Sequence, residues 1–230
     1  MITLVTFAAN FGTRSSSPFC IKAEYLLNMA GVPWQRQDEV DPRKYPKGKL
    51  PAITIGLETV GGSDGIQQYL EGQGHNFNAN LSDLEKAQPH AFVRMAEEHM
   101  YFHLVLDRWG DDAVWPTVRD VYFNQIPKLP RLLITRRIRN TLIKGLITQG
   151  LGRLTPKERM DRLEPDLQAI SAQLAHHTYL FSDQPTAADA SVASVLAAMR
   201  ATPIETSLSR RIANDQVLSD YIDRVDAALG

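Results

Sequence analysis

Short strand-like and helix-like segments alternate along the first third of the chain. Residues 3–7 are apolar and rich in strand-forming side chains, which is typical of a buried strand. Ser17 and Pro18 then supply an N-cap and a first-turn proline, and the helical apolar spacing that follows stops at Gly31. The pattern predicts a strand, a loop and a helix in that order.

The next segments complete the pattern of a small α/β unit. Residues 50–55 are rich in β-branched side chains and predict a second buried strand, and residues 58–60 follow a turn at Gly56 as a short edge strand. Residues 63–70 place three apolar side chains on one helical face. Strand, helix, an optional strand, two further strands and a helix predict an α/β domain.

Helical periodicity dominates the rest of the chain. Residues 72–82 contain two Gly and three Asn and are predicted to be a linker. Residues 83–109 and 130–148 carry long helical patterns of apolar positions. We therefore predict two domains, an α/β domain over residues 1–75 and an all-helical domain over residues 83–230.

Local signals refine the helical region. Thr155 and Thr186 each begin a Thr-x-x-acid sequence, which is typical of a helix start. Residues 157–174 have the pattern of a helix. Pro165 lies inside this segment and is predicted to kink or divide it, because proline lacks the backbone N–H of a helix interior.

Composition limits the classes of protein that fit. Lys and Arg number 25 against 26 Asp and Glu, so net charge gives no argument for nucleic acid or membrane binding. The single cysteine, Cys20, forms neither an intramolecular disulfide nor, alone, a thiolate metal site. We find no leader-like or spanning apolar segment and expect a soluble cytoplasmic protein.

Two short sequences in the α/β region could carry chemistry. Ser17-Pro18-Phe19-Cys20 stands at a predicted helix start, where free N–H groups and partial positive charge favour an anion such as a thiolate. Alternatively, Ser17 only caps the helix and Cys20 is a small buried apolar side chain. In Lys49-Leu50-Pro51, a cis bond would turn the Leu50 backbone outward to pair with an extended ligand, whereas a trans bond makes an ordinary loop.

Together these motifs resemble the cytosolic glutathione transferase superfamily. The resemblance rests on the Ser-Pro-Phe-Cys helix start, the Leu-Pro-Ala-Ile strand, the Ser-Asp-Gly-Ile-Gln-Gln-Tyr-Leu helix and the Asp-Gln-Pro-Thr-Ala-Ala-Asp sequence at residues 183–189. The loop at residues 10–17, the segment 115–130 and Gln-Gly-Leu-Gly-Arg at 149–153 are more similar to the branch with failed axon connections proteins, metaxins and bacterial relatives.

The resemblance implies a thioredoxin-like domain that binds glutathione as co-substrate, a helical domain, an electrophile pocket between them, and a homodimer. It places Ser17 where related proteins have a catalytic Ser or Cys, as a hydrogen-bond donor to the glutathione sulfur. Leu50 would pair its backbone with the cysteinyl part of glutathione beside a cis Pro51. Ser63 and the Asp64 backbone would bind the γ-glutamyl carboxylate at a helix start. The cations implied for the other carboxylate are Lys49 and Lys44.

Some positions depart from the family pattern. Gly62 stands where an acidic or amide residue usually precedes the helix-start serine, so a ligand for the γ-glutamyl amine is missing unless Asp64 serves. Thr6 stands where tyrosine-type transferases carry their catalytic tyrosine, which favours a serine-type enzyme. The hydroxyls that compete with Ser17 for the sulfur are those of Ser15 and Ser16.

Three features of the helical region have less direct meanings. Residues 121–157 contain eight Lys and Arg and no acid. We favour a solvated helix face whose cations pair with acids elsewhere, and the alternative is contact with an anionic membrane. Nucleic acid binding is not expected, since no aromatic residues are interleaved for base stacking. His99 and His103 share a helical face but lack a His-Glu-x-x-His sequence, so no metal site is predicted; one ring should pack at the interdomain cleft and the other be solvated. Four aromatic residues are expected to pack in the core, with an apolar pocket or a dimer contact as the alternatives: Trp109, Trp115, Tyr122 and Phe123.

The sequence thus supports three functional hypotheses. The first is an enzyme that conjugates glutathione to a hydrophobic electrophile, whose identity the sequence does not give. The second is a non-catalytic adaptor that keeps the fold and uses the helical domain, including the basic stretch, to contact a partner or membrane. Thiol redox chemistry through Cys20 ranks last, because dithiol exchange needs a first cysteine at the Ser17 position.

Overall fold

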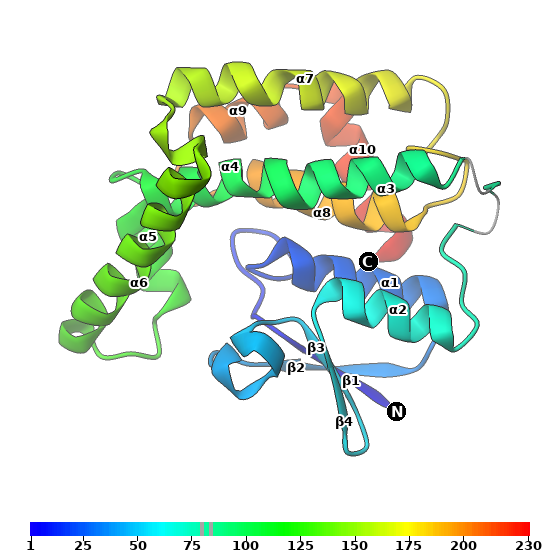
Figure 1. Cartoon of the computed structure of the whole chain (residues 1–230), viewed down its shortest axis with the longest axis horizontal. Coiled ribbons are helices and arrows are strands. Elements are labelled where there is room, and N and C mark those ends of the chain that lie inside the picture. Colours follow the sequence, from blue (N-terminus) through cyan, green and yellow to red (C-terminus); the bar gives the residue numbers. More distant parts are fainter. Residues whose placement is uncertain (79–80, 83–84) are drawn as a thin grey trace.

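The computed structural model describes residues 1–78, 81–82 and 85–230. A four-stranded sheet with the order β2-β1-β3-β4 forms the base of the molecule (Figure 1). Its central strand β1 pairs in parallel with β2 and antiparallel with β3, and β4 pairs antiparallel with β3 at the edge. The strand bounds are Ile2–Thr6 for β1, Trp34–Asp38 for β2, Ala52–Ile55 for β3 and Glu58–Gly61 for β4.

Two helices, α1 (Pro18–Ala30) and α2 (Ser63–Gly72), lie side by side between the sheet and the helical domain (Figure 1). Gly31 ends α1 in the left-handed conformation with φ of 63°, as the stop signal predicts. Residues 18 and 20–27 of α1 are all buried, because this helix is covered by the sheet on one side and by helices on the other. The short 3₁₀ turns η1 (Pro42–Lys44) and η2 (Pro46–Gly48) lead from β2 to β3.

A long helical rod opens the second part of the chain. It consists of α3 (Ala87–Met95), α4 (Tyr101–Val105) and two π-helical turns, η3 (Ala96–Met100) and η4 (Leu106–Gly110). The predicted helix start at Asp83 and part of the predicted linker, residues 79–80, lie outside the described residues. The boundaries 1–75 and 83–230 stay a prediction.

Helix α8 (Ala187–Arg200) is buried over almost its whole length, with α1, α3 and the two C-terminal helices packed against it. Both predicted capping boxes are present, with Thr155 capping α7 and Thr186 capping α8. The other helix bounds are Trp115–Tyr122 for α5, Lys128–Gln149 for α6, Leu151–Arg153 for η5, Pro156–Leu174 for α7, Ser207–Ala213 for α9 and Gln216–Leu229 for α10.

Of the two outcomes predicted for Pro165, division of the helix is wrong, because α7 runs through residue 165 without a break. A kink stays a prediction. Pro165 is exposed, whereas Leu163, Leu167 and Ile170 form the buried face. The carbonyl group that loses its partner therefore faces solvent, where water can satisfy it.

The described chain confirms an α/β domain of thioredoxin-like arrangement followed by an all-helical domain. No helix among the described residues combines the length and apolarity needed to cross a bilayer. The four predicted aromatics pack together around α5, with ring centroids of Trp109 and Trp115 4.8 Å apart, which agrees with core packing.

Candidate functional site

The loop at residues 7–17 connects β1 to α1 and contains three consecutive serines, Ser15, Ser16 and Ser17. Its conformation sets the burial and the hydrogen bonds of each of their hydroxyls. Ser15 is buried, and its hydroxyl donates to the Phe7 carbonyl at 2.8 Å. The Ser16 hydroxyl accepts from Asn10 Nδ2 at 2.7 Å and donates to the Ala8 carbonyl at 3.1 Å. Both hydroxyls are therefore used within the loop.

Ser17 differs from its two neighbours. It is the N-cap of α1 with extended backbone angles, but its hydroxyl makes no capping hydrogen bond, and its side chain is only partly buried. The free N–H groups of the first turn of α1 add partial positive charge beside it. Ser17 is thus a partly exposed hydroxyl at a helix N-terminus, the arrangement that favours an anion.

Cys20 lies one helical turn further along α1 and is completely buried. Burial raises the pKa of its thiol, and hydrogen bonds from Thr6, the Phe7 backbone and the Ser15 and Ser17 side chains offset only part of this effect. A buried, neutral thiol is a poor nucleophile. The interpretation of Cys20 as a small buried side chain therefore fits the structure better than a redox role.

We expect Cys20 to react with a disulfide reagent at least about 100-fold more slowly in the folded protein than in the urea-unfolded chain. The thiolate is the reactive form, and burial both excludes the reagent and disfavours that form. Absorbance of the released thiolate measures the rate. Equal rates in the folded and unfolded protein would mean that the thiol is accessible and would restore the redox hypothesis.

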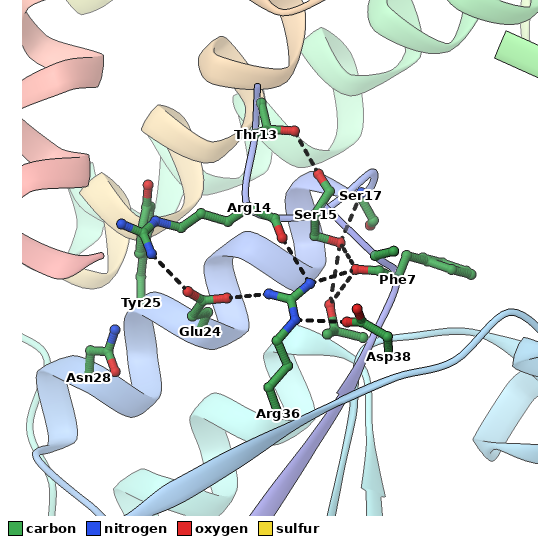
Figure 2. Close-up of polar contacts among 12 residues, drawn as sticks. Phe7, Thr13, Arg14, Ser15, Ser17, Glu24, Tyr25, Asn28, Arg36 and Asp38 are labelled. Carbon is green, nitrogen blue, oxygen red and sulfur yellow. Dashed lines mark hydrogen bonds and ion pairs between the residues drawn. The ribbon is translucent and has the colours of Figure 1, made fainter. Parts of the chain in front are cut away.

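An ion-pair network holds the serine loop from the side of the sheet (Figure 2). The Arg36 guanidinium of β2 donates to the Phe7 carbonyl at 3.0 Å and to the Arg14 carbonyl at 2.9 Å, so it joins the two ends of the loop. Glu24 of α1 lies 3.1 Å from Arg36 and 3.2 Å from Arg14. No sequence motif singles out Arg36 and Glu24, which hold the loop beside Ser17 from the side of the sheet.

Replacing Arg36 with methionine is expected to loosen the loop by about 1–2 kcal/mol, because hydrogen bonds from a charged donor to two carbonyls are lost at a partly exposed position. Amide hydrogen exchange of residues 8–16 should accelerate about tenfold. Gln35→Met, on the same strand with one exposed hydrogen bond to Thr3, is the matched control. Unchanged exchange in the Arg36 variant would contradict this role.

The Leu50–Pro51 bond is cis, as the resemblance to glutathione transferases implies. Leu50 is buried in a small apolar cluster with Cys20 and Val5, which brings this segment to the start of α1. The Pro51 carbonyl accepts from the Gly62 N–H at 2.8 Å and so ties the segment to the start of α2. The fold therefore brings Ser17, Leu50 and Ser63 to one edge of the α/β domain.

Ser63 begins α2 and is buried, while the preceding Gly62 has φ of 83°, a conformation that favours glycine. The glycine at position 62, where the family usually has an acidic or amide residue, therefore suits the local backbone. Of the implied cations, Lys49 is exposed, and Lys44 Nζ lies 3.2 Å from Glu39 and is paired outside the site.

The side chain of Asp64 belongs to an interdomain ion-pair network. Its carboxylate lies 2.8 Å from Nζ of Lys22, which is buried in α1, and 3.1 Å from Arg94 of α3. Burial works against the charged carboxylate, but both cations favour it, and the pKa of Asp64 is lowered overall. Lys22 also reaches buried Glu97 at 2.6 Å, whose carboxylate accepts from Ser191 of α8 at the same distance. Asp64 is thus already paired with protein cations.

Residues of the helical domain contact the loop from its other side. Buried Arg108 of η4 donates to the Ser16 carbonyl at 3.3 Å and to the Tyr122 hydroxyl at 2.7 Å, and its guanidinium lies 5.6 Å from the Phe11 ring centre. Phe19 of α1 and Tyr101 of α4 meet edge to face at 4.7 Å. Aromatic rings from both domains therefore meet next to the serine loop, and Arg108 was not identifiable from the sequence.

The predicted placement of one histidine at the interdomain cleft is wrong. His103 is buried, and burial lowers its pKa to about 3. His99 is partly exposed, and its Nδ1 lies 2.5 Å from Asp166 of α7. Both rings lie within the helical domain, between the long rod and α7. Over residues 1–78, 81–82 and 85–230, no group of His, Cys, Asp and Glu is arranged to hold a metal ion.

Comparison with known proteins agrees with this fold. Residues 18–114 match the glutathione S-transferase N-terminal domain and residues 163–225 match the glutathione S-transferase C-terminal domain, together well over half of the chain. The chain belongs to the glutathione transferase superfamily.

Among its relatives are both enzymes and metaxins. It is 28% identical over 232 residues to the isoprene-epoxide–glutathione S-transferase of Rhodococcus sp. (strain AD45), covering 98% of each chain. It is 24% identical to human metaxin-2 over 183 residues, covering 79% of this chain and 70% of that one. A glutathione transferase from Phanerochaete chrysosporium has the same fold, with a TM-score of 0.63 at 18% identity over 99% and 96% of the two chains. These relatives agree with the predicted branch.

Proposed function

We propose that the protein conjugates glutathione to a hydrophobic electrophile, with the Ser17 hydroxyl donating a hydrogen bond to the glutathione sulfur. The observation that carries this proposal is the different orientation of the candidate groups. Ser15 and Cys20 are buried and the Ser16 hydroxyl is bonded within the loop, whereas Ser17 is partly exposed at the N-terminus of α1. Its hydroxyl and the first-turn N–H groups favour the thiolate, which is the nucleophile.

The remaining donors fit a tripeptide with two carboxylates. In the proposed arrangement the Leu50 backbone pairs with the cysteinyl part beside the cis Pro51. The start of α2, at Ser63 and the Asp64 backbone N–H, binds the γ-glutamyl carboxylate as helix N-termini bind anions. Lys49, exposed next to Leu50, pairs with the other carboxylate. The Asp64 side chain is paired with Lys22 and Arg94, so we do not assign it to the amine.

For the electrophile we propose a small epoxide, by analogy with the substrate in the name of the Rhodococcus relative. The thiolate attacks one epoxide carbon, the carbon–oxygen bond breaks, and the resulting alkoxide takes a proton from water. Aromatic side chains beside the serine loop, Phe11 and Tyr122 among them, supply apolar surface for such a ligand.

Isothermal titration with glutathione, followed by conjugation assays with a small epoxide and an aryl halide, tests the proposal. We expect binding in the millimolar range or tighter and formation of the thioether. If the folded protein shows no heat of binding, released or absorbed, at millimolar glutathione, the proposal is overturned.

A non-catalytic adaptor is the second candidate. It is favoured by the commitment of Asp64 to protein cations together with Gly62, which leave the γ-glutamyl amine without an obvious carboxylate. Similarity to metaxin-2 adds to it. The titration separates the candidates, because the adaptor hypothesis predicts a folded chain without glutathione binding. The cytoplasmic location and the homodimer stay predictions.

A further inference from the structure

The helix α6 departs from the compact body of the protein. Its N-terminal end extends past the helical domain at the lower left of Figure 1, together with α5 and the loop between them. Only Thr135 and Leu146 are buried along its 22 residues. Most of α6 therefore presents its side chains to solvent.

Exposed apolar side chains gather in the first two turns of α6. Leu129 is 81% exposed and Leu133 75%, and Leu132 and Ile134 follow with 48% and 45%. Exposed leucines are common singly, but a group at a projecting end indicates a contact surface. We call residues 128–134 the α6 tip.

Cations follow the α6 tip along the same helix. Arg136, Arg137 and Lys144 are exposed and, with Leu133, Asn140 and Thr141, line an open groove of about 340 Å³. Two other cations of this helix are paired, Arg131 with Asp120 at 3.4 Å and Arg139 with Asp112 at 2.7 Å. The predicted pairing with acids therefore holds for Arg131, for Arg139 and, outside this helix, for Lys157 with Asp161, but not for the cations of the groove.

Exposed apolar side chains are thus concentrated in the α6 tip, which also carries Lys128 and the paired Arg131, and the arginines of the groove follow it along the helix axis. At 1.5 Å per residue, the seven residues of the α6 tip span about 10 Å, with the arginines immediately behind. An apolar element enters the boundary between headgroups and acyl chains by about 5–10 Å, and Lys or Arg near the surface attract anionic lipids. The helix has the dimensions for insertion by its end, not for lying flat.

We propose that α6 docks the protein on anionic membrane surfaces, with the leucines of the α6 tip in the interface and Arg136 and Arg137 among the headgroups. Charge separates this partner from two others. A symmetric contact between two α6 helices would bring these cations together, since residues 121–157 contain no acid. A nucleic acid would suit the arginines but would leave the leucines in water. The docking surface is separate from the Ser17 site, so it applies to an enzyme or an adaptor.

Co-sedimentation with vesicles tests the proposal. The probes are pure phosphatidylcholine and phosphatidylcholine with roughly one third phosphatidylserine. We expect binding to the anionic vesicles only, weakened by salt. Leu129→Ser with Leu133→Ser, and separately Arg136→Glu with Arg137→Glu, should each weaken the binding at least about tenfold.

Matched variants control for composition and charge. Ile147→Ser alters an exposed apolar residue far from the α6 tip, and Arg43→Glu with Lys47→Glu makes the same charge change on the α/β domain. Both should bind as the parent does, and thermal unfolding should be alike in all variants because the changed side chains are exposed.

Three results would overturn the docking proposal. One is that the parent protein ignores anionic vesicles. Another is that the leucine pair changes only the oligomeric mass in light scattering, which would make the α6 tip a subunit contact. The third is that the arginine pair weakens binding to a DNA duplex while the leucine pair alters nothing.

Discussion

Replacing Ser17 with alanine is expected to lower kcat for glutathione conjugation by about 100- to 1,000-fold, the usual effect of removing one donor to a developing or bound anion. Without the hydroxyl the pKa of the bound glutathione thiol rises, so the loss should be largest near neutral pH and smaller in alkaline solution. The pH at which kcat is half-maximal should therefore shift to a higher value. Steady-state kinetics with an epoxide or aryl halide from pH 6 to 9 measures both effects.

The structure offers clean controls for this substitution. The Ser17 hydroxyl does not cap α1, so Ser17→Ala should leave the unfolding free energy nearly unchanged. Ser16→Ala, which removes a hydroxyl bonded only within the loop, should keep kcat within about threefold of the parent. Full activity in the Ser17 variant together with loss of activity in the Ser16 variant would move the sulfur contact to Ser16.

Replacing Lys22 with methionine is expected to lower the unfolding free energy by about 3–5 kcal/mol, because it leaves the Glu97 carboxylate buried without its cation. Urea denaturation followed by circular dichroism measures the loss. Glutathione affinity should fall as well if the proposed site is correct, since Lys22 also holds Asp64 at the start of α2.

Two comparison variants separate burial from charge. Arg94→Met removes a cation from the same Asp64 carboxylate at a largely exposed position and should cost less than about 1 kcal/mol. The double variant Lys22→Met with Glu97→Gln should lose less unfolding free energy than the two single variants lose together, because no buried charge then lacks a partner. A Lys22 variant as stable as the Arg94 variant would contradict the importance of this network.

The positions of many elements follow from the sequence because their signals are local. Pro18 and Gly31 bound α1, and the boxes at Thr155 and Thr186 begin α7 and α8, each through contacts within four residues. Where a local signal opposed tertiary packing, the local signal misled, and the predicted division of the helix at Pro165 did not occur. Pro165 disfavours a helix interior, yet the buried leucine face of α7 keeps the helix continuous.

The candidate site was only partly predictable for the same reason. Motif resemblance singled out Ser17, Leu50 and Ser63 as candidates, and the fold brings these segments to one edge. Arg36 and Arg108, which hold the serine loop from its two sides, belong to no motif. Their role depends on contacts between residues far apart in sequence, which periodicity and spacing do not report.

By itself the sequence determined an α/β domain followed by a helical one and the helix start that carries Ser17, because hydrophobic period, capping and turn chemistry act over a few neighbouring residues. The superfamily followed from the resemblance of whole motifs. Only the tertiary structure decided that Ser15 is buried, that the Ser16 hydroxyl is bonded within its loop, that the Cys20 thiol is buried, and that Asp64 is paired with Lys22. It also decided that the α6 tip is exposed. A side chain's surroundings are set by distant segments packed against it, and a neutral total charge gives no sign of where each charge finds its partner.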